Sequence, residues 1–204
     1  FGPLVSPLSF REPTMTAHIA AAIDDLSGGR LILGLGAGWQ EREHYKFGHD
    51  LLDVSARMDR FEEGLAVITG LLQSDEPVDF EGAYYELHDA LLLPRPQRAG
   101  GPPILIGGNG PQRTLPLVAE YAGEWNGVFI PPARFADLNS RLDELLVAQG
   151  RQPEDVRRSL MTGTIFGRDE AALAEKLDGR NLSAAELRER GLICLLYTSD
   201  AADE

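Results

Sequence analysis

The sequence predicts an α/β fold built on a parallel sheet, and two observations carry this prediction. Apolar segments typical of strands alternate with amphipathic helical segments along most of the chain. The segment RLILGLG at 30–36 is apolar without polar alternation, which is typical of a strand that is buried on both faces. About five strand–helix units follow one another, enough for part of an eight-stranded barrel or for a small doubly wound open sheet.

The first half of the chain supplies the clearest elements. FGPLVSP is compatible with the end of a buried strand that runs into a loop, and residues 14–26 carry apolar side chains at helical spacing. The glycines at 28–29 end that helix. After the strand at 30–36 we expect a loop over 39–53, a helix with one apolar stripe over 55–72, and a hairpin-like stretch in DFEGAYYELHDALLLPRP.

The second half continues the alternation, and PPILIGG predicts another buried strand. The elements expected after it are a helix over 115–122, a strand over 125–130, a helix over 135–149, a strand over 160–166 and a helix over 170–177. Residues 194–204, CLLYTSDAADE, continue none of this periodicity. We therefore predict a domain over 1–193 followed by a non-native tail, the read-through of a sequencing adapter.

Composition restricts the partners of the protein. Hydrophobic residues make up 43% of the 204 residues, and the formal net charge is −13, which argues against nucleic acid or an anionic membrane as the main partner. The single cysteine, Cys194, and the scattered histidines predict no metal site, and no apolar run is long enough to span a bilayer. We expect a cytoplasmic protein that acts on a small molecule. Because the chain starts at Phe1 without a starting methionine, we also expect it to be a piece of a longer protein.

Glycine-rich segments follow two of the predicted strands. The first segment, LGLGAGW, places Gly34, Gly36 and Gly38 around the end of the strand at 30–36. A flat or phosphorylated ligand can lie against a backbone that has no β-carbons, and the alternative is a tight turn inside a packed barrel. The spacing G-x-G-x-G does not match the dinucleotide-binding fingerprint.

The second segment, ILIGGNGPQRT at 104–114, leads from a strand into a helix. The free N–H groups of a helix N-terminus favour an anion, and Arg113 could add a guanidinium suited to a phosphate. We expect Thr114 to cap the helix; the alternative is an ordinary strand–turn–helix link with a solvated arginine. Because ligands bind at the carboxyl ends of parallel strands, we expect both glycine-rich segments to face the same site.

The remaining polar candidates are weaker. Trp39 could stack on a planar ligand or plug the mouth of a barrel. The histidines are expected at the surface or on helix flanks, and the carboxylates after the first glycine run are expected to be solvated; these residues are His18, His44, His49, His88, Glu41 and Glu43. The sequence has neither a G-x-S-x-G elbow nor a P-loop, so no catalytic residue is assigned.

Several blocks of the chain match one family in order and spacing. SGGRLILGLGAGWQEREHYKFG, RMDRFEEGLAVITGLL, FEGAYYEL and PRPQRAGGPPILIGGNGPQRTLPLVAEYAGEWN resemble the luciferase-like monooxygenase superfamily, in particular its oxidoreductases that use the deazaflavin coenzyme F-420. The resemblance implies a (β/α)₈ TIM barrel with FGPLVSP as its third strand and RLILGLG as its fourth. The first two strands and the eighth are then missing, so the expected fold is an incomplete barrel of about five of the eight units.

The resemblance also implies a bed for the cofactor. A cis peptide in the third strand of the family matches Leu4–Val5, and Ala37 and Gly38 match positions that line the ring and its side chain. The loop that holds the phosphate matches four residues, with two more as nearby support: Gly107, Gly108, Asn109 and Gly110, then Arg113 and Thr114. Some relatives carry a catalytic glutamate where this chain has Trp39, so that role is not transferred.

The resemblance implies an oxidoreductase that transfers a hydride between coenzyme F-420 and a small organic substrate. An FMN-dependent monooxygenase on the same barrel is the alternative, and an inactive truncated fragment is a second one. An unrelated phosphate-binding barrel, such as an aldolase, is disfavoured because no strand end shows a lysine or paired carboxylates. Dimers are common in the family, which implies a homodimer here.

Overall fold

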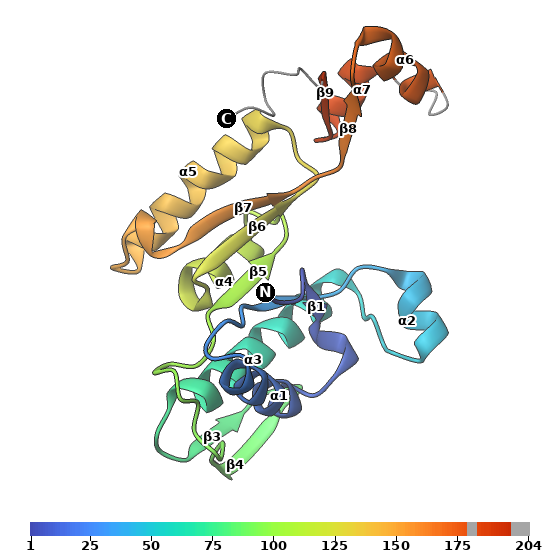
Figure 1. Ribbon diagram of the computed structural model, residues 1–204. Helices are drawn as coiled ribbons and strands as arrows, with labels where there is room; N and C mark the ends of the chain where they lie inside the picture. The colour runs from blue at the N-terminus through green and yellow to red at the C-terminus, as the bar shows by residue number, and fades with distance from the viewer. Residues whose placement is uncertain (179–182, 197–204) are drawn as a thin grey trace.

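The computed structural model describes residues 1–178 and 183–196, and its centre is a five-stranded sheet (Figure 1). Its strands, in order across the sheet, are β1 (Ser6–Pro7), β2 (Leu33–Gly36), β5 (Ile104–Gly107), β6 (Glu124–Val128) and β7 (Arg157–Met161). Every neighbouring pair is parallel. The strand order follows the chain without the reversal that a doubly wound sheet requires, so the sheet is an arc of a barrel. The predicted incomplete barrel is confirmed.

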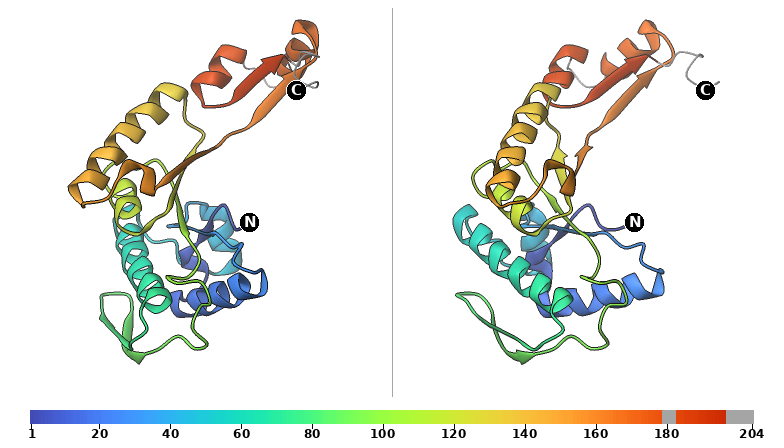
Figure 2. Two further views of the ribbon diagram at one scale, coloured as in Figure 1. Left: turned by 60° about the vertical axis from the view of Figure 1, so that its left-hand side comes forward. Right: turned by 90° about the vertical axis from the view of Figure 1, so that its left-hand side faces the viewer.

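The main helices form one layer outside this arc, as Figure 2 shows. They are α1 (Pro13–Leu26), α3 (Val54–Gln73), α4 (Thr114–Tyr121) and α5 (Pro132–Ala148). Each packs against the next, α1 on α3, α3 on α4 and α4 on α5, as the outer helices of a barrel do. Single turns of 3₁₀-helix stand at Leu8–Phe10 (η1) and Pro153–Asp155 (η2). None of the helices in the described part of the chain is long and apolar enough to cross a membrane.

Strand β6 shows how the sheet divides its side chains between core and site. Trp125 is fully buried on the helix side, where its ring stacks on Phe135 of α5 with 5.1 Å between centroids. Because side chains alternate along a strand, Glu124, Asn126 and Val128 face the other way, toward the interior of the arc. The core side anchors the sheet and the interior side is left for a ligand.

Two insertions extend the barrel units. Residues 39–53, predicted as a loop, contain the short helix α2 (Glu41–Phe47), which ends at Gly48 in the left-handed conformation with φ 71°. Its seven residues carry no long apolar stripe, and for that reason the sequence pattern missed it. The hairpin predicted after α3 is confirmed as the antiparallel strands β3 (Val78–Glu81) and β4 (Glu86–Ala90).

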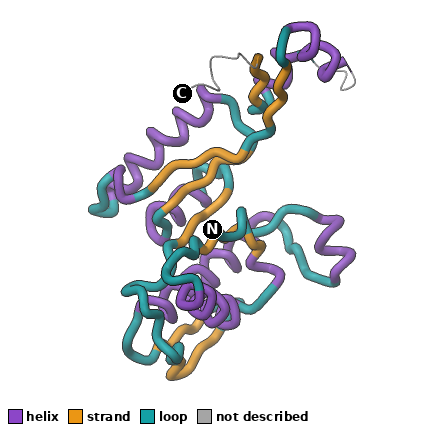
Figure 3. The backbone as a smooth tube through the Cα atoms, in the orientation of Figure 1, coloured by secondary structure: helices purple, strands orange, loops and turns teal. Residues whose placement is uncertain are grey.

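The C-terminal segment forms a small unit of its own, which extends from the end of β7 in Figures 1 and 3. The strand predicted over 160–166 is split: β7 ends at Met161, and β8 (Thr164–Gly167) pairs in parallel with β9 (Ile193–Leu196) in a separate sheet. Helix α6 (Glu170–Asp178) matches the prediction, and α7 (Ala184–Glu189) was not predicted. A separate apolar cluster holds the unit together: Ile165, Leu173, Leu177 and Leu187.

The predicted boundary of the domain falls inside this unit. Residues 194–196 belong to β9, so the strand continues past the boundary at 193. The rest of the predicted tail, residues 197–204, lies outside the described residues. The division into a domain over 1–193 and a non-native tail stays a prediction.

Candidate cofactor site

The carboxyl ends of the parallel strands open into one cavity of about 650 Å³. This volume is ordinary for a cofactor or substrate site. Every strand of the five-stranded sheet contributes to the lining, which consists of Leu4, Val5, Pro7, Gly36, Ala37, Gly38, Trp39, Glu43, Arg57, Met58, Gly107, Gly108, Thr114, Asn126, Val128, Phe129 and Met161. The two glycine-rich segments therefore face the same space, as we expected from a parallel sheet.

The first glycine-rich segment is a closely packed wall. A β-carbon at Gly34 would collide with the carbonyl oxygen of Pro3, and one at Gly36 would lie 2.7 Å from Cγ2 of Val5. The Leu4–Val5 peptide bond is cis, as the family resemblance implies. Gly34 and Gly36 are therefore needed for packing, as the turn-and-packing alternative had it. Ala37 and Gly38, just beyond the strand, remain open to a ligand.

A buried histidine supports the loop at Gly38. His44 of α2 is only 2% exposed, so of the two places expected for the histidines, the surface and helix flanks, the surface is excluded. The Gln40 carbonyl lies 2.8 Å from Nδ1 of His44 and can only accept, so Nδ1 donates and Nε2 is the acceptor. Ser9 donates its hydroxyl proton to Nε2 over 2.7 Å. A β-carbon at Gly38, which has φ 87°, would lie 3.1 Å from both Nε2 and the Ser9 Oγ, so this pair closes the floor under the loop.

The second glycine-rich segment is held by hydrogen bonds to its neighbour β6. The Asn109 side chain donates to the Val128 carbonyl over 2.7 Å and accepts from the Val128 amide over 2.9 Å. Nε1 of Trp125 donates to the Gly108 carbonyl over 2.8 Å. The side chain of Asn109 is therefore occupied in positioning the loop, and Asn109 and Gly110 do not line the cavity.

The same loop presents backbone N–H groups without acceptors. Helix α4 begins at Thr114, and Arg113 at its N-cap makes no side-chain cap bond, so the prediction that Thr114 caps the helix is wrong. Within the described part of the chain, the Thr114 hydroxyl has no partner, and five backbone amides donate to no acceptor: those of Asn109, Gly110, Gln112, Arg113 and Thr114. Free donors at the first turn of a helix favour an anion.

The structure assigns different tasks to two arginines. Nη2 of Arg113 lies 2.6 Å from Asp59 and 3.2 Å from Glu62, both on α3, and it does not line the cavity. The hydrogen bond to Asp59 raises the pKa of Arg113 further above its ordinary value. Arg57, one turn from the start of the same helix, lines the cavity and has no ion pair within the described residues. Among the described residues that line the cavity, Arg57 is therefore the cation without an ion pair.

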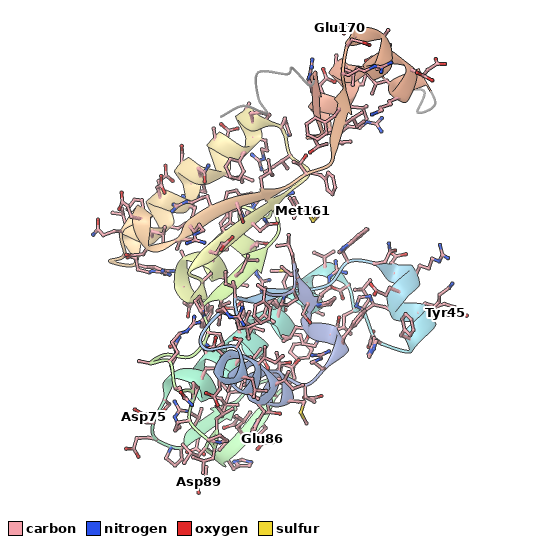
Figure 4. All side chains as sticks on the ribbon, in the orientation of Figure 1. Tyr45, Asp75, Glu86, Asp89, Met161 and Glu170 are labelled. Carbon is pink, nitrogen blue, oxygen red and sulfur yellow. The ribbon has the colours of Figure 1, made fainter. Side chains whose placement is uncertain are left out.

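Sequence reasoning missed the part of the lining that β6 and β7 contribute. Asn126 and Val128 are separated by two positions on β6, and this spacing could have placed them on one face once the strand was recognised. Met161, labelled in Figure 4, ends β7 where the predicted strand ran on to 166. Trp39 lies on the rim of the cavity with 77% of its surface exposed, so it does not plug the mouth.

Comparison with known proteins adds an independent line of evidence. A family model described as luciferase-like monooxygenase matches residues 1–193. A phthiodiolone/phenolphthiodiolone dimycocerosates ketoreductase of Mycobacterium kansasii is 33% identical over 181 residues, which are 87% of this chain and 47% of the relative. An F-420-dependent glucose-6-phosphate dehydrogenase of Amycolatopsis mediterranei is 35% identical and aligns over 62% of this chain and 36% of the relative. The chain spans about half, or less, of the length of these curated relatives.

The fold has close counterparts among solved structures. An F-420-dependent secondary alcohol dehydrogenase in complex with an F-420–acetone adduct matches with a TM-score of 0.79, over 95% of this chain and 65% of that chain. At 19% identity this likeness shows the fold alone. The match of the family model to nearly the whole chain identifies the family: the chain belongs to the luciferase-like monooxygenases.

Proposed function

We propose that this chain is part of an oxidoreductase that transfers a hydride between coenzyme F-420 and a small organic substrate. The observation that carries the proposal is that one cavity extends from the wall of Val5, Ala37 and Gly38 to Thr114, at the start of a helix whose first backbone amides have no acceptor among the described residues. A flavin-type cofactor has these two parts, a flat ring and a phosphate.

The residues present fit both parts of such a cofactor. Val5, Ala37 and Gly38 offer the ring a surface, and the start of α4 offers the phosphate the Thr114 hydroxyl and the free amides of residues 109, 110 and 112–114. We assign the guanidinium next to the phosphate to Arg57 in place of Arg113, because the charge of Arg113 is already compensated by Asp59 and Glu62. When bound, the cofactor supplies the electron-pair chemistry, and the protein binds it, orients it and excludes water.

Two candidate cofactors share this bed. Coenzyme F-420 comes first because the IGGNGPQRTL block resembles that branch and a relative at 35% identity is named as F-420-dependent. FMN with a monooxygenase reaction is the second candidate, since the family as a whole is described as monooxygenases. The homodimer implied by the family stays a prediction.

Titration of the purified chain with each cofactor tests the proposal. We expect F-420 to bind at least about tenfold more tightly than FMN, which corresponds to about 1.4 kcal/mol. Thr114→Val, which removes the free hydroxyl at constant shape, should weaken the binding of F-420 by about fivefold. Tight FMN binding without F-420 binding would reverse the order of the candidates. A chain that unfolds cooperatively and yet binds neither cofactor would contradict the proposed function and favour an inactive fragment.

A further inference from the structure

The wall of the cavity contains an amide side chain that the cofactor bed described above does not use. Asn126 of β6 is only 3% exposed and lines the cavity. Its Nδ2 donates to the Ser159 Oγ on β7 over 2.9 Å, and Ser159 donates to Oε1 of Glu124 over 2.7 Å. The three residues are neighbours in the sheet, because Asn126 pairs with Ser159 in the register of β6 and β7.

The polarity of this chain of hydrogen bonds follows from proton counting. A serine hydroxyl has one proton, and a carboxylate oxygen accepts, so the 2.7 Å contact with Glu124 takes the proton of Ser159. The Trp125 carbonyl, the only other acceptor near this hydroxyl among the described residues, is more distant at 3.4 Å. The Ser159 oxygen must then accept from Asn126, which fixes Nδ2 toward Ser159.

This arrangement leaves the carbonyl oxygen of Asn126 as the free group. Oδ1 has no hydrogen-bond partner within the described residues. It is not fully enclosed by protein, and because Asn126 lines the cavity, Oδ1 is accessible from there. An acceptor that faces the cavity without a protein partner is free to accept a hydrogen bond from a ligand. An acceptor whose orientation is fixed in advance also discriminates against ligands that bring another acceptor to the same place.

We propose that Oδ1 of Asn126 accepts a hydrogen bond from an uncharged donor of the bound cofactor. Ser159 and Glu124 form a positioning pair that fixes the orientation of the Asn126 amide. FMN and F-420 share two such donors, the imide N–H of the ring and the hydroxyls of the chain that links ring and phosphate. This inference rests on the proposed function, because it requires a flavin-type molecule in the cavity. It adds a specificity-determining residue on β6, outside both glycine-rich segments.

Binding of FMN and two analogues to the wild-type chain and to Asn126→Leu tests the acceptor. Asn126→Leu should weaken the binding of FMN by about tenfold. N3-methyl-FMN lacks the imide donor, and an analogue with a pentyl phosphate chain lacks the hydroxyls. The analogue that lacks the true donor should bind wild type and Asn126→Leu equally, so it also identifies the donor. If the substitution weakens all three ligands by the same factor, or none of them, the acceptor role is overturned.

Two substitutions at Ser159 test the positioning pair. Ser159→Ala removes the hydrogen bond to Glu124 and should weaken the binding of FMN by about threefold. Ser159→Thr keeps the hydroxyl and should retain wild-type affinity for FMN. Equal losses in both variants would show a packing effect and contradict the positioning role. Wild-type chain that binds neither FMN nor F-420 would overturn the proposed function together with this inference. Binding that requires the phosphate and ignores Asn126 would overturn the inference alone.

Discussion

The two glycine-rich strand ends look alike in sequence and work differently in the structure. At the end of β2, Gly34 and Gly36 make room for the backbone of Pro3 and the side chain of Val5, so the glycines serve packing. At the end of β5, the loop is held to β6 through Asn109, and the backbone amides of residues 109, 110 and 112–114 have no acceptor among the described residues. One strand end supplies a surface and the other supplies hydrogen-bond donors.

This difference shows why glycine content alone does not define a binding site. The sequence does not distinguish a glycine that is needed to avoid a steric collision from one that makes room for a ligand. What separates the two cases is the partner of each backbone group, which only the folded structure provides. The comparison leads to four tests, arranged from the largest expected effect to the smallest.

The largest effect is expected from a β-carbon in the packed wall. Gly34→Ala should lower the free energy of unfolding by about 3 kcal/mol, because the new methyl group meets the Pro3 carbonyl and the β1 segment must shift. Urea denaturation followed by circular dichroism measures this. Gly70→Ala is the matched control. Gly70 lies inside helix α3, where alanine is favoured over glycine by about 0.5–1 kcal/mol, and its new β-carbon would lie at an ordinary contact distance of 3.4 Å from Val78 of β3. Equal stabilities of the two variants would contradict the packing role of Gly34.

The second effect separates the two arginines near the donor-rich strand end. Arg57→Met should weaken the binding of F-420 by about thirtyfold, or roughly 2 kcal/mol, through loss of a charge-assisted contact with the phosphate. Arg113→Met should change the affinity by less than about twofold, since Arg113 is paired with Asp59 and Glu62. Fluorescence titration at two salt concentrations measures both variants. A larger loss in Arg113→Met than in Arg57→Met would return the phosphate role to Arg113.

A third, smaller effect concerns the clamp that holds the donor loop. Asn109→Ala should destabilise the chain by about 1.5 kcal/mol, because it leaves the amide and carbonyl of Val128 without partners. The substitution should also weaken the binding of F-420, because it loosens the donor loop, although the side chain of Asn109 does not line the cavity. Thermal unfolding and titration of the same variant measure the two effects. Unchanged affinity in a destabilised variant would show that the loop keeps its shape without the clamp.

The smallest effect is on alkaline stability. Burial, followed by the hydrogen bond and negative charge of Glu120, raises the pKa of Tyr121 well above its ordinary value. The unfolded chain loses this proton from about pH 10, while the folded chain keeps it, so stability falls as the pH rises above that point. Tyr121→Phe should therefore show a shallower loss of unfolding free energy between about pH 9 and about pH 11. Tyr45→Phe, at an exposed position on α2, is the control, and identical slopes for Tyr121→Phe and wild type would contradict the assignment.

Sequence patterns predicted the arc of the barrel because its parts are local. Continuous apolar runs mark the buried strands at 33–36 and 104–107, and long apolar stripes mark α3 and α5. Helix α2 escaped because a short helix that buries one histidine has no detectable period. The break between β7 and β8 was not predicted, because Thr162 and Gly163 interrupt the strand without a proline or a charged residue that would indicate it.

The site was predictable where it follows from strand ends and was not predictable where it depends on pairing. The segments after β2 and β5 had to meet once the sheet was parallel. The exchange of Arg113 for Arg57 depends on Asp59 and Glu62 of α3, which are far from Arg113 in sequence. The Asn126–Ser159–Glu124 chain likewise requires the register of β6 and β7. Contacts between distant segments are set by packing, which periodicity does not encode.

The most direct test of a shared cavity is a crystal structure of the chain with coenzyme F-420. We predict one molecule that spans both strand ends, its ring on Val5, Ala37 and Gly38 and its phosphate on the amides before Thr114 with Arg57 beside it. A cofactor bound elsewhere, or a phosphate bound at 107–114 with its ring turned away from β1 and β2, would contradict the account.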